Sequence, residues 1–131
     1  MEKRTLSFGE YIKDKRMSHN PRYTLKKMAE ALGMNLTQLS DIENGRKKPF
    51  DGDRINQFCS ILGLSDDERT ELYDLAARDL DSVPEDIANT IMYTEQGDLA
   101  RVALRKVNEG KGTVEMWKEL IRMMDEEGRS K

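Results

Sequence analysis

The chain has 131 residues, of which 37% are apolar and 36% charged, and it contains only three Pro and nine Gly. This composition predicts an all-α protein, either one domain or a small domain with an extension, and argues against a strand-and-turn architecture. No apolar run approaches the about 20 residues that span a bilayer, and the first residues lead into no signal-peptide core, so we expect a cytoplasmic location and no membrane partner. One Cys and one His exclude an internal disulfide and argue against a metal site.

The net charge of -3 conceals an uneven distribution along the chain. Residues 1–50 hold 11 Lys and Arg against 6 Asp and Glu, whereas residues 51–131 hold 11 against 19. A basic front half joined to an acidic back half is typical of a nucleic-acid-binding domain followed by a module with another role.

The front half predicts three helices, over residues 7–17, 24–32 and 35–44. Ser7, Thr24 and Asn35 are suitable capping residues for their first turns. The second helix carries apolar residues at the i, i+3, i+4, i+7 spacing of one buried face. Gly33 ends it, because glycine readily takes the left-handed conformation. So short a linker makes the second and third helices cross steeply, which predicts a helix-turn-helix unit whose second helix enters the DNA major groove.

The helical period divides the helix over residues 35–44 into two faces. Leu39, Ile42 and Glu43 share the side that faces the protein. The opposite side carries small polar residues, which suits a helix lying in a groove, although a solvated polar face is the alternative reading. The outward and border positions are Leu36, Thr37, Gln38, Ser40, Asp41 and Asn44.

Three consecutive cations and a proline follow the third helix, at Arg46, Lys47, Lys48 and Pro49. Cations in a loop directly after such a helix are placed to reach DNA phosphates. Two further helices are predicted. One covers about residues 51–62 and buries Ile55, Phe58, Cys59 and Leu62. The other opens with a capping box at Ser65 and ends near residue 78.

The remaining sequence predicts a small helical extension over residues 79–131. Its helices begin over residues 82–85, near Asp98 and at Val114, with Gly110 and Gly112 interrupting the chain before the last. The last helix, residues 114–127, is strongly apolar on one side. That side is expected to pack as core against the two helices before it; the alternative is a dimer seam. Its apolar residues are Met116, Trp117, Leu120, Ile121, Met123 and Met124.

Two runs also resemble a known family. Residues 27–34 (KMAEALGM) and 39–49 (LSDIENGRKKP) are similar to the phage-repressor/Cro helix-turn-helix regulators, often labelled XRE. The likeness covers roughly residues 6–77 and implies a five-helix, lambda-repressor-like DNA-binding domain, here within residues 1–78. It also implies a partly buried salt bridge between Arg16 and Glu43.

The resemblance assigns roles to the polar residues already singled out. Base contacts are expected from the first turns of the recognition helix, where Gln can pair with adenine and Asp can accept from cytosine. These residues are Leu36, Thr37, Gln38, Ser40 and Asp41. Phosphate contacts are expected from Thr24, Asn35, Asn44, Arg46, Lys47 and Lys48.

The sequence therefore predicts a sequence-specific DNA-binding transcriptional regulator, a repressor that binds double-stranded DNA as a homodimer. The extension would dimerise it or receive a signal. The alternative is an antitoxin-like interaction module whose acidic C-terminal helices bind a protein partner. No catalytic motif is present, so we expect neither enzymatic activity nor a cofactor.

Overall fold

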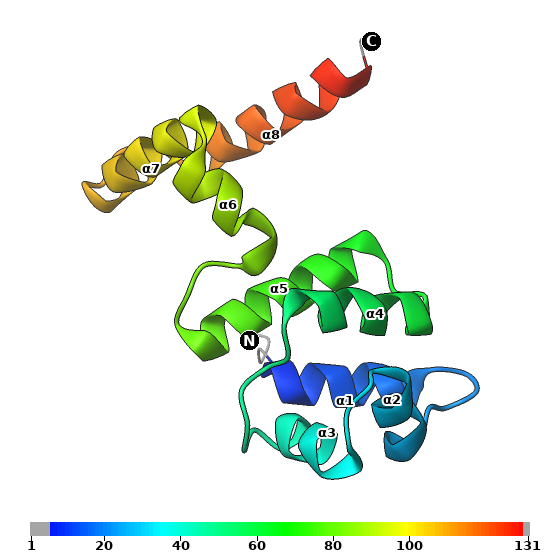
Figure 1. Cartoon of the computed structure of the whole chain (residues 1–131). Coiled ribbons are helices and arrows are strands. Elements are labelled where there is room, and N and C mark those ends of the chain that lie inside the picture. Colours follow the sequence, from blue (N-terminus) through cyan, green and yellow to red (C-terminus); the bar gives the residue numbers. More distant parts are fainter. Residues whose placement is uncertain (1–5, 130–131) are drawn as a thin grey trace, which may run out of the picture. The chain divides into compact units, whose positions relative to one another are not determined.

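Residues 6–129, which the computed structural model describes, form eight α-helices and no strand (Figure 1). The all-α class expected from the composition is confirmed. The helices are α1 (Phe8–Ser18), α2 (Leu25–Ala31), α3 (Leu36–Glu43), α4 (Gly52–Leu62), α5 (Asp66–Leu80), α6 (Glu85–Tyr93), α7 (Glu95–Asn108) and α8 (Val114–Arg129).

Side-chain caps define where most of these helices begin. Ser7 with Glu10, Asn35 with Gln38, and Ser65 with Glu68 form reciprocal capping boxes at the starts of α1, α3 and α5. The start expected near residue 98 for the seventh helix is wrong. Thr94 accepts a hydrogen bond from the Gly97 N–H at 2.9 Å, so α7 begins at Glu95.

The chain divides into two compact units between Ala88 and Asn89, within α6. The first unit continues past α5 because the Glu85 carboxylate accepts a 2.6 Å hydrogen bond from the Gly52 N–H at the start of α4. The expected functional boundary between residues 78 and 79 remains a prediction.

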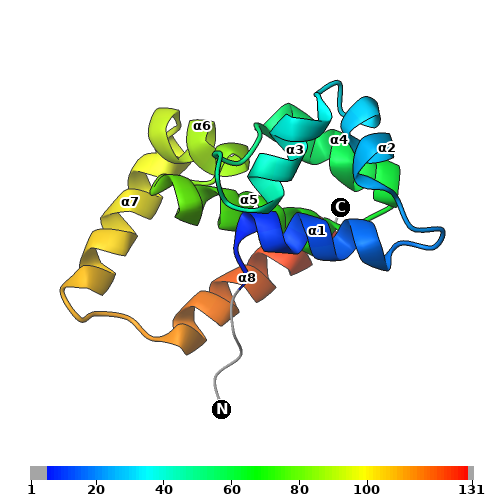
Figure 2. The same ribbon diagram turned by 90° about the horizontal axis from the view of Figure 1, so that it is seen from below.

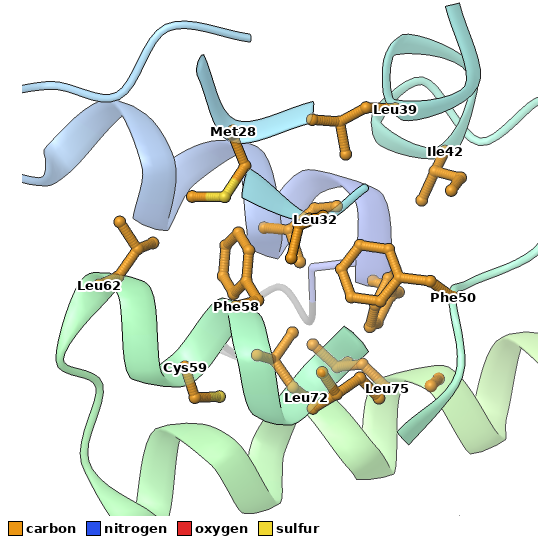
Figure 3. Packing of buried hydrophobic residues seen from close by; sticks show 14 of the residues in the cluster. Met28, Leu32, Leu39, Ile42, Phe50, Phe58, Cys59, Leu62, Leu72 and Leu75 are labelled. Atoms are coloured by element: carbon orange, nitrogen blue, oxygen red, sulfur yellow. The ribbon is translucent and has the colours of Figure 1, made fainter. Parts of the chain in front are cut away.

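The core of the first unit lies around α1, which packs against α3 on one side and α5 on the other (Figure 1). Figure 3 shows Phe58 and Phe50 between the side chains of α2 and α3 and those of α4 and α5. The ring of Phe8 meets that of Phe50 edge-on, with 5.0 Å between centroids. Cys59 is buried, and burial raises the pKa of its thiol. The residues expected to be buried on α4 all lie in this core.

Gly9 allows α1 to approach α3 closely. A β-carbon at this position would lie 2.6 Å from the Glu43 carbonyl oxygen and nearer still to that of Ile42. Both clashing atoms belong to the backbone, so a side chain at residue 9 would push the helices apart. The sequence pattern did not single out this glycine.

A buried ion pair joins the same two helices. The Arg16 guanidinium donates from Nε to Glu43 Oε2 at 2.8 Å and from Nη2 to Oε1 at 3.0 Å, while Nη1 donates to the Tyr23 carbonyl at 2.8 Å. Both side chains are less than a tenth exposed. Because the carboxylate is held by two parallel charge-assisted bonds, the pair fixes the rotation of α3 as well as its position.

The expectation that the apolar side of the last helix forms a core with the preceding helices is wrong. Figure 2 shows α7 and α8 as the arms of a V, and no described side chain of α8 is buried. Met116 is 63% exposed and Ile121 57%. Trp117 alone among the described residues of α8 is partly covered.

We predict that Gly9→Ala lowers the free energy of unfolding by about 1–3 kcal/mol or more, because the added methyl group must displace the α3 backbone. Urea unfolding followed by far-UV circular dichroism measures the loss. Gly128→Ala is the matched control, since a β-carbon there meets no atom within 4 Å. An unchanged midpoint for Gly9→Ala would contradict the close approach.

We also predict that Glu43→Ala costs about 3–5 kcal/mol, because Arg16 is left with an unpaired charge away from water. The double substitution Arg16→Met with Glu43→Leu should cost much less than the two single changes added together. If the cost of the double substitution equals the sum of the costs of the two single substitutions, the two side chains act independently.

Candidate nucleic-acid interface

The turn between α2 and α3 has the geometry of a helix-turn-helix. Gly33 adopts φ +68°, and the Met34 N–H donates to the Ala29 carbonyl at 3.0 Å, which closes the end of α2. Asn35 then caps α3 through its side chain. The two helices consequently change direction within a few residues and pack against each other.

The inner face of α3 is held by the core. Leu39 and Ile42 are buried among the apolar residues of α1, α2 and α4, and Glu43 is paired with Arg16. Because these three side chains hold one side of α3 against the core, the opposite side of the helix must face outward.

The outer face of α3 carries the residues that the sequence pointed to. Thr37 and Asn44 are exposed, and Ser40 and Asp41 are partly exposed. Leu36 is 48% exposed, which leaves an apolar surface beside the polar row. The structure therefore brings the expected base-reading positions onto one accessible surface.

Gln38, expected to contact a base, takes part in the cap of α3. Its Oε1 accepts a hydrogen bond from the Asn35 N–H at 3.2 Å, while the Gln38 N–H donates to Asn35 Oδ1 at 2.8 Å. A bidentate contact with adenine needs both the oxygen and the nitrogen of the amide. In this conformation the oxygen already accepts one hydrogen bond within the cap, which restricts how the amide could meet a base.

Asp41 has a cationic neighbour. Arg46 Nη1 lies 3.7 Å from Asp41 Oδ1, and the Asp41 carbonyl accepts from the Arg46 N–H at 2.8 Å. The guanidinium is 71% exposed and the carboxylate 21%. This pairing reduces the repulsion that an isolated Asp would meet near phosphates.

The positions expected to contact phosphate lie on the edges of this surface. Thr24 and Asn35 have exposed side chains at the starts of α2 and α3, and their side-chain oxygens accept from the helix N–H groups of Lys27 and Gln38. The Thr24 hydroxyl and the Asn35 amide keep their own hydrogens for an acceptor outside the protein. Asn44 Nδ2 lies 3.4 Å from Ser40 Oγ.

Several cationic side chains line an open groove of about 480 Å³ beside α3. It is lined by Gln38, Arg46, Lys47, Lys48 and Arg54, with Met34, Ile42 and Phe50 at its base. Arg54 was missed from the sequence because it lies on α4, beyond the basic loop. It also donates from Nε to the Leu32 carbonyl at 3.2 Å, which satisfies the end of α2. The sequence could have indicated this role, because Arg54 is a cation in the first turn of the helix that follows the basic loop.

Other classes of site find no support among residues 6–129. No group of three or more Asp, Glu, His or Cys in that range is placed to hold a metal ion. None of the described helices is long and apolar enough to cross a membrane.

Comparison with known proteins agrees with this geometry. A family model described as a helix-turn-helix domain matches residues 7–72, about half of the chain. Over 41 residues the chain is 56% identical to the ImmF control region 10 kDa protein of Bacillus phage phi105. That match covers 31% of this chain and 43% of the phage protein, so the chain spans less than half the length of this relative.

No solved structure matches the chain significantly. The family model covers the caps, the Gly33 turn and the whole of α3, which are the features that build the exposed face. The resemblance expected from the sequence is confirmed, and the chain belongs to the helix-turn-helix domain family, in the form of XRE-like regulators.

Proposed function

We propose that the protein is a sequence-specific DNA-binding transcriptional regulator, a repressor that places α3 in the major groove as a homodimer. The observation that carries the proposal is the outer face of α3. It is polar and exposed, its orientation is set by the core and by the Arg16–Glu43 pair, and four cations border it. A rod of this diameter fits the major groove of B-DNA.

The proposed contacts fall into two groups. Base readout is assigned to the first turns of α3, through Leu36, Thr37, Gln38, Ser40 and Asp41. Phosphate binding is assigned to the residues around them, which fix the orientation of the domain without reading sequence. These are Thr24, Asn35, Asn44, Arg46, Lys47 and Lys48, to which the structure adds Arg54.

Electrostatics support this orientation. The excess of cations lies in residues 1–50, which include the whole of α3 and the basic loop. The excess of acids lies in residues 51–88, which hold 3 Lys and Arg against 11 Asp and Glu. A domain with opposite charges on successive segments is drawn to DNA by its basic side.

A homodimer and a location with the DNA, in the cytoplasm, belong to the same proposal. One such domain reads only a few base pairs, and two copies on half-sites about 34 Å apart give useful specificity. The similarity to a protein of a phage control region favours regulation of a promoter, and repression by covering it is the simplest mechanism.

We predict that Lys47→Ala and Lys48→Ala each weaken binding to every duplex sequence and lower the slope of log affinity against log salt by about 0.9. Fluorescence anisotropy over a salt series measures both quantities. Arg69→Ala, which removes an exposed cation from α5, is the matched control and should leave the slope unchanged. An unaltered slope for both lysine variants would remove the loop from the interface.

Thr37→Ala and Asp41→Ala should change which bases are preferred, by about 1–3 kcal/mol at the affected base pair. Selection from a randomised duplex pool, carried out in parallel with the wild type, reveals the change and requires no known operator. Ser60→Ala, on the exposed side of α4, serves as the control. If both α3 variants select the wild-type sequence, α3 does not read DNA.

A further inference from the structure

The second helical unit, from Asn89 onward, presents a large apolar surface that nothing within it covers. On α8 the apolar residues occupy one half of the helix circumference, and the charged residues except Glu127 lie on the other half. Such a division normally marks a helix whose apolar half is buried. Here the apolar half is open, and its members are Val114, Met116, Trp117, Leu120, Ile121, Met123 and Met124.

Helix α7 adds to this surface. Between α7 and α8 lies a largely apolar groove of about 360 Å³, with Val107, Met116, Trp117 and Leu120 among its walls and two lysines, Lys106 and Lys111, beside it. Figure 2 shows the ribbons of α7 and α8 diverging as a V from the loop that joins them. Within the described part of the second unit, the one buried residue is Gly97, which has no side chain to bury.

This unit therefore lacks a core of its own. Helices of 14 and 16 residues are marginal in water unless an apolar face is covered. Ordering them costs conformational entropy that burial of apolar surface must offset. A partner that covers this face supplies that burial.

The charges of the unit identify the partner. Residues 89–131 hold eight Lys and Arg and eight Asp and Glu, so two copies do not repel each other and no strongly charged partner is favoured. Three positive residues lie where α7 ends, at Arg105, Lys106 and Lys111, of which Lys111 pairs with Glu109 at 3.4 Å. Three negative residues lie near the other end of α8, over residues 125–127, about 18 Å along the helix, and the middle one pairs with Arg122.

An antiparallel second copy brings these opposite charges together. If two α8 helices pair antiparallel about Leu120 and Ile121, the acidic end of each lies over the basic end of the partner's α7. The same arrangement places Met124 of one copy against the groove beside Trp117 of the other. The contact is then the same on both copies, as two-fold symmetry requires.

The exposed apolar area of α7 and α8 taken together is of the size that such a dimer buries. Ten large apolar residues of α7 and α8 are each 40–65% exposed. If each side chain has about 60–120 Å² of apolar surface in all, the exposed fractions of the ten together amount to roughly 500 Å² of uncovered apolar surface on each copy. A standard interface buries about 800 Å² per partner, and in homodimers about 65% of it is apolar.

We propose that the apolar face of α7 and α8 is the seam of a homodimer formed with a second copy of this chain, with the two α8 helices antiparallel. The inference deepens the proposed function, on which it rests for the need to read two half-sites. The alternative, in which acidic C-terminal helices bind a basic partner protein, gains no support from residues 89–131, whose charges balance.

Sedimentation velocity of the full chain over a concentration series tests the seam. The wild type should be a dimer at micromolar concentration, and Ile121→Glu with Met124→Glu should raise the dimer dissociation constant by 100-fold or more. Neither side chain is buried in the single chain, so the first unit keeps its fold, which far-UV circular dichroism verifies. Glu115→Lys, on the charged side of α8, should change nothing. A monomeric wild type, or a variant that stays dimeric, would overturn the seam.

Two further readouts report on its details. Trp117 is the only tryptophan of the chain, so its emission should shift to shorter wavelength as the concentration rises through the dissociation constant. Glu127→Lys and Lys106→Glu should each weaken the dimer about 10-fold, and the two together should restore it. If the double variant dimerises no more tightly than either single variant, the antiparallel orientation is wrong.

DNA binding separates this inference from the proposed function. With a half-site duplex taken from the selected sequence, the Ile121→Glu, Met124→Glu variant should bind as well as the wild type and lose only the gain from a second half-site. Wild-type monomers that bind DNA would refute the seam and the homodimer, and would leave DNA recognition by α3 standing. Dimers that select no sequence would leave the seam and refute the function.

Discussion

The ion pair between Arg16 and Glu43 is the constraint on which the recognition surface depends. A carboxylate bound by two parallel N–H groups permits little rotation of the helix that carries it. The pair also joins α1 to the loop before α2, through the Tyr23 carbonyl. Together with the absence of a side chain at Gly9, it places α3 close against α1 and leaves the opposite face accessible. A surface proposed to enter a DNA groove must itself be held in place, and these two features hold α3 against α1.

Much of this arrangement could be predicted from sequence because it is local. Helix caps, turn glycines and apolar spacing act within one or two turns, so α1 to α5 and the outward face of α3 follow from them. The family resemblance supplied the Arg16–Glu43 pair, which joins residues 27 positions apart. Gly9 and Arg54 were missed because their roles depend on a neighbour from another helix, and no local pattern records it.

For the second unit, the presence of the helices was predicted correctly but their packing was not. Its apolar spacing correctly indicated helices with one face to be covered, but spacing does not say what covers it. The expectation of an internal core followed from the usual packing of small domains, whereas in the structure α7 and α8 diverge as the arms of a V and no described side chain of α8 is buried. Apolar periodicity predicts that a face will be buried, and only the packing of the other elements decides whether the burial is within one chain.

The capping role of Gln38 has a consequence for the kind of operator such a protein would tolerate. While its amide oxygen holds the first turn of α3, the amide N–H groups are the part of the side chain that the cap does not use. Adenine N7, guanine N7 and O6, and thymine O4 all accept a hydrogen bond in the major groove, so a contact through the N–H groups alone does not tell these bases apart. If α3 enters the groove with its cap intact, the base beside Gln38 would not be strictly specified, and such a protein would accept a family of related sites instead of a single sequence.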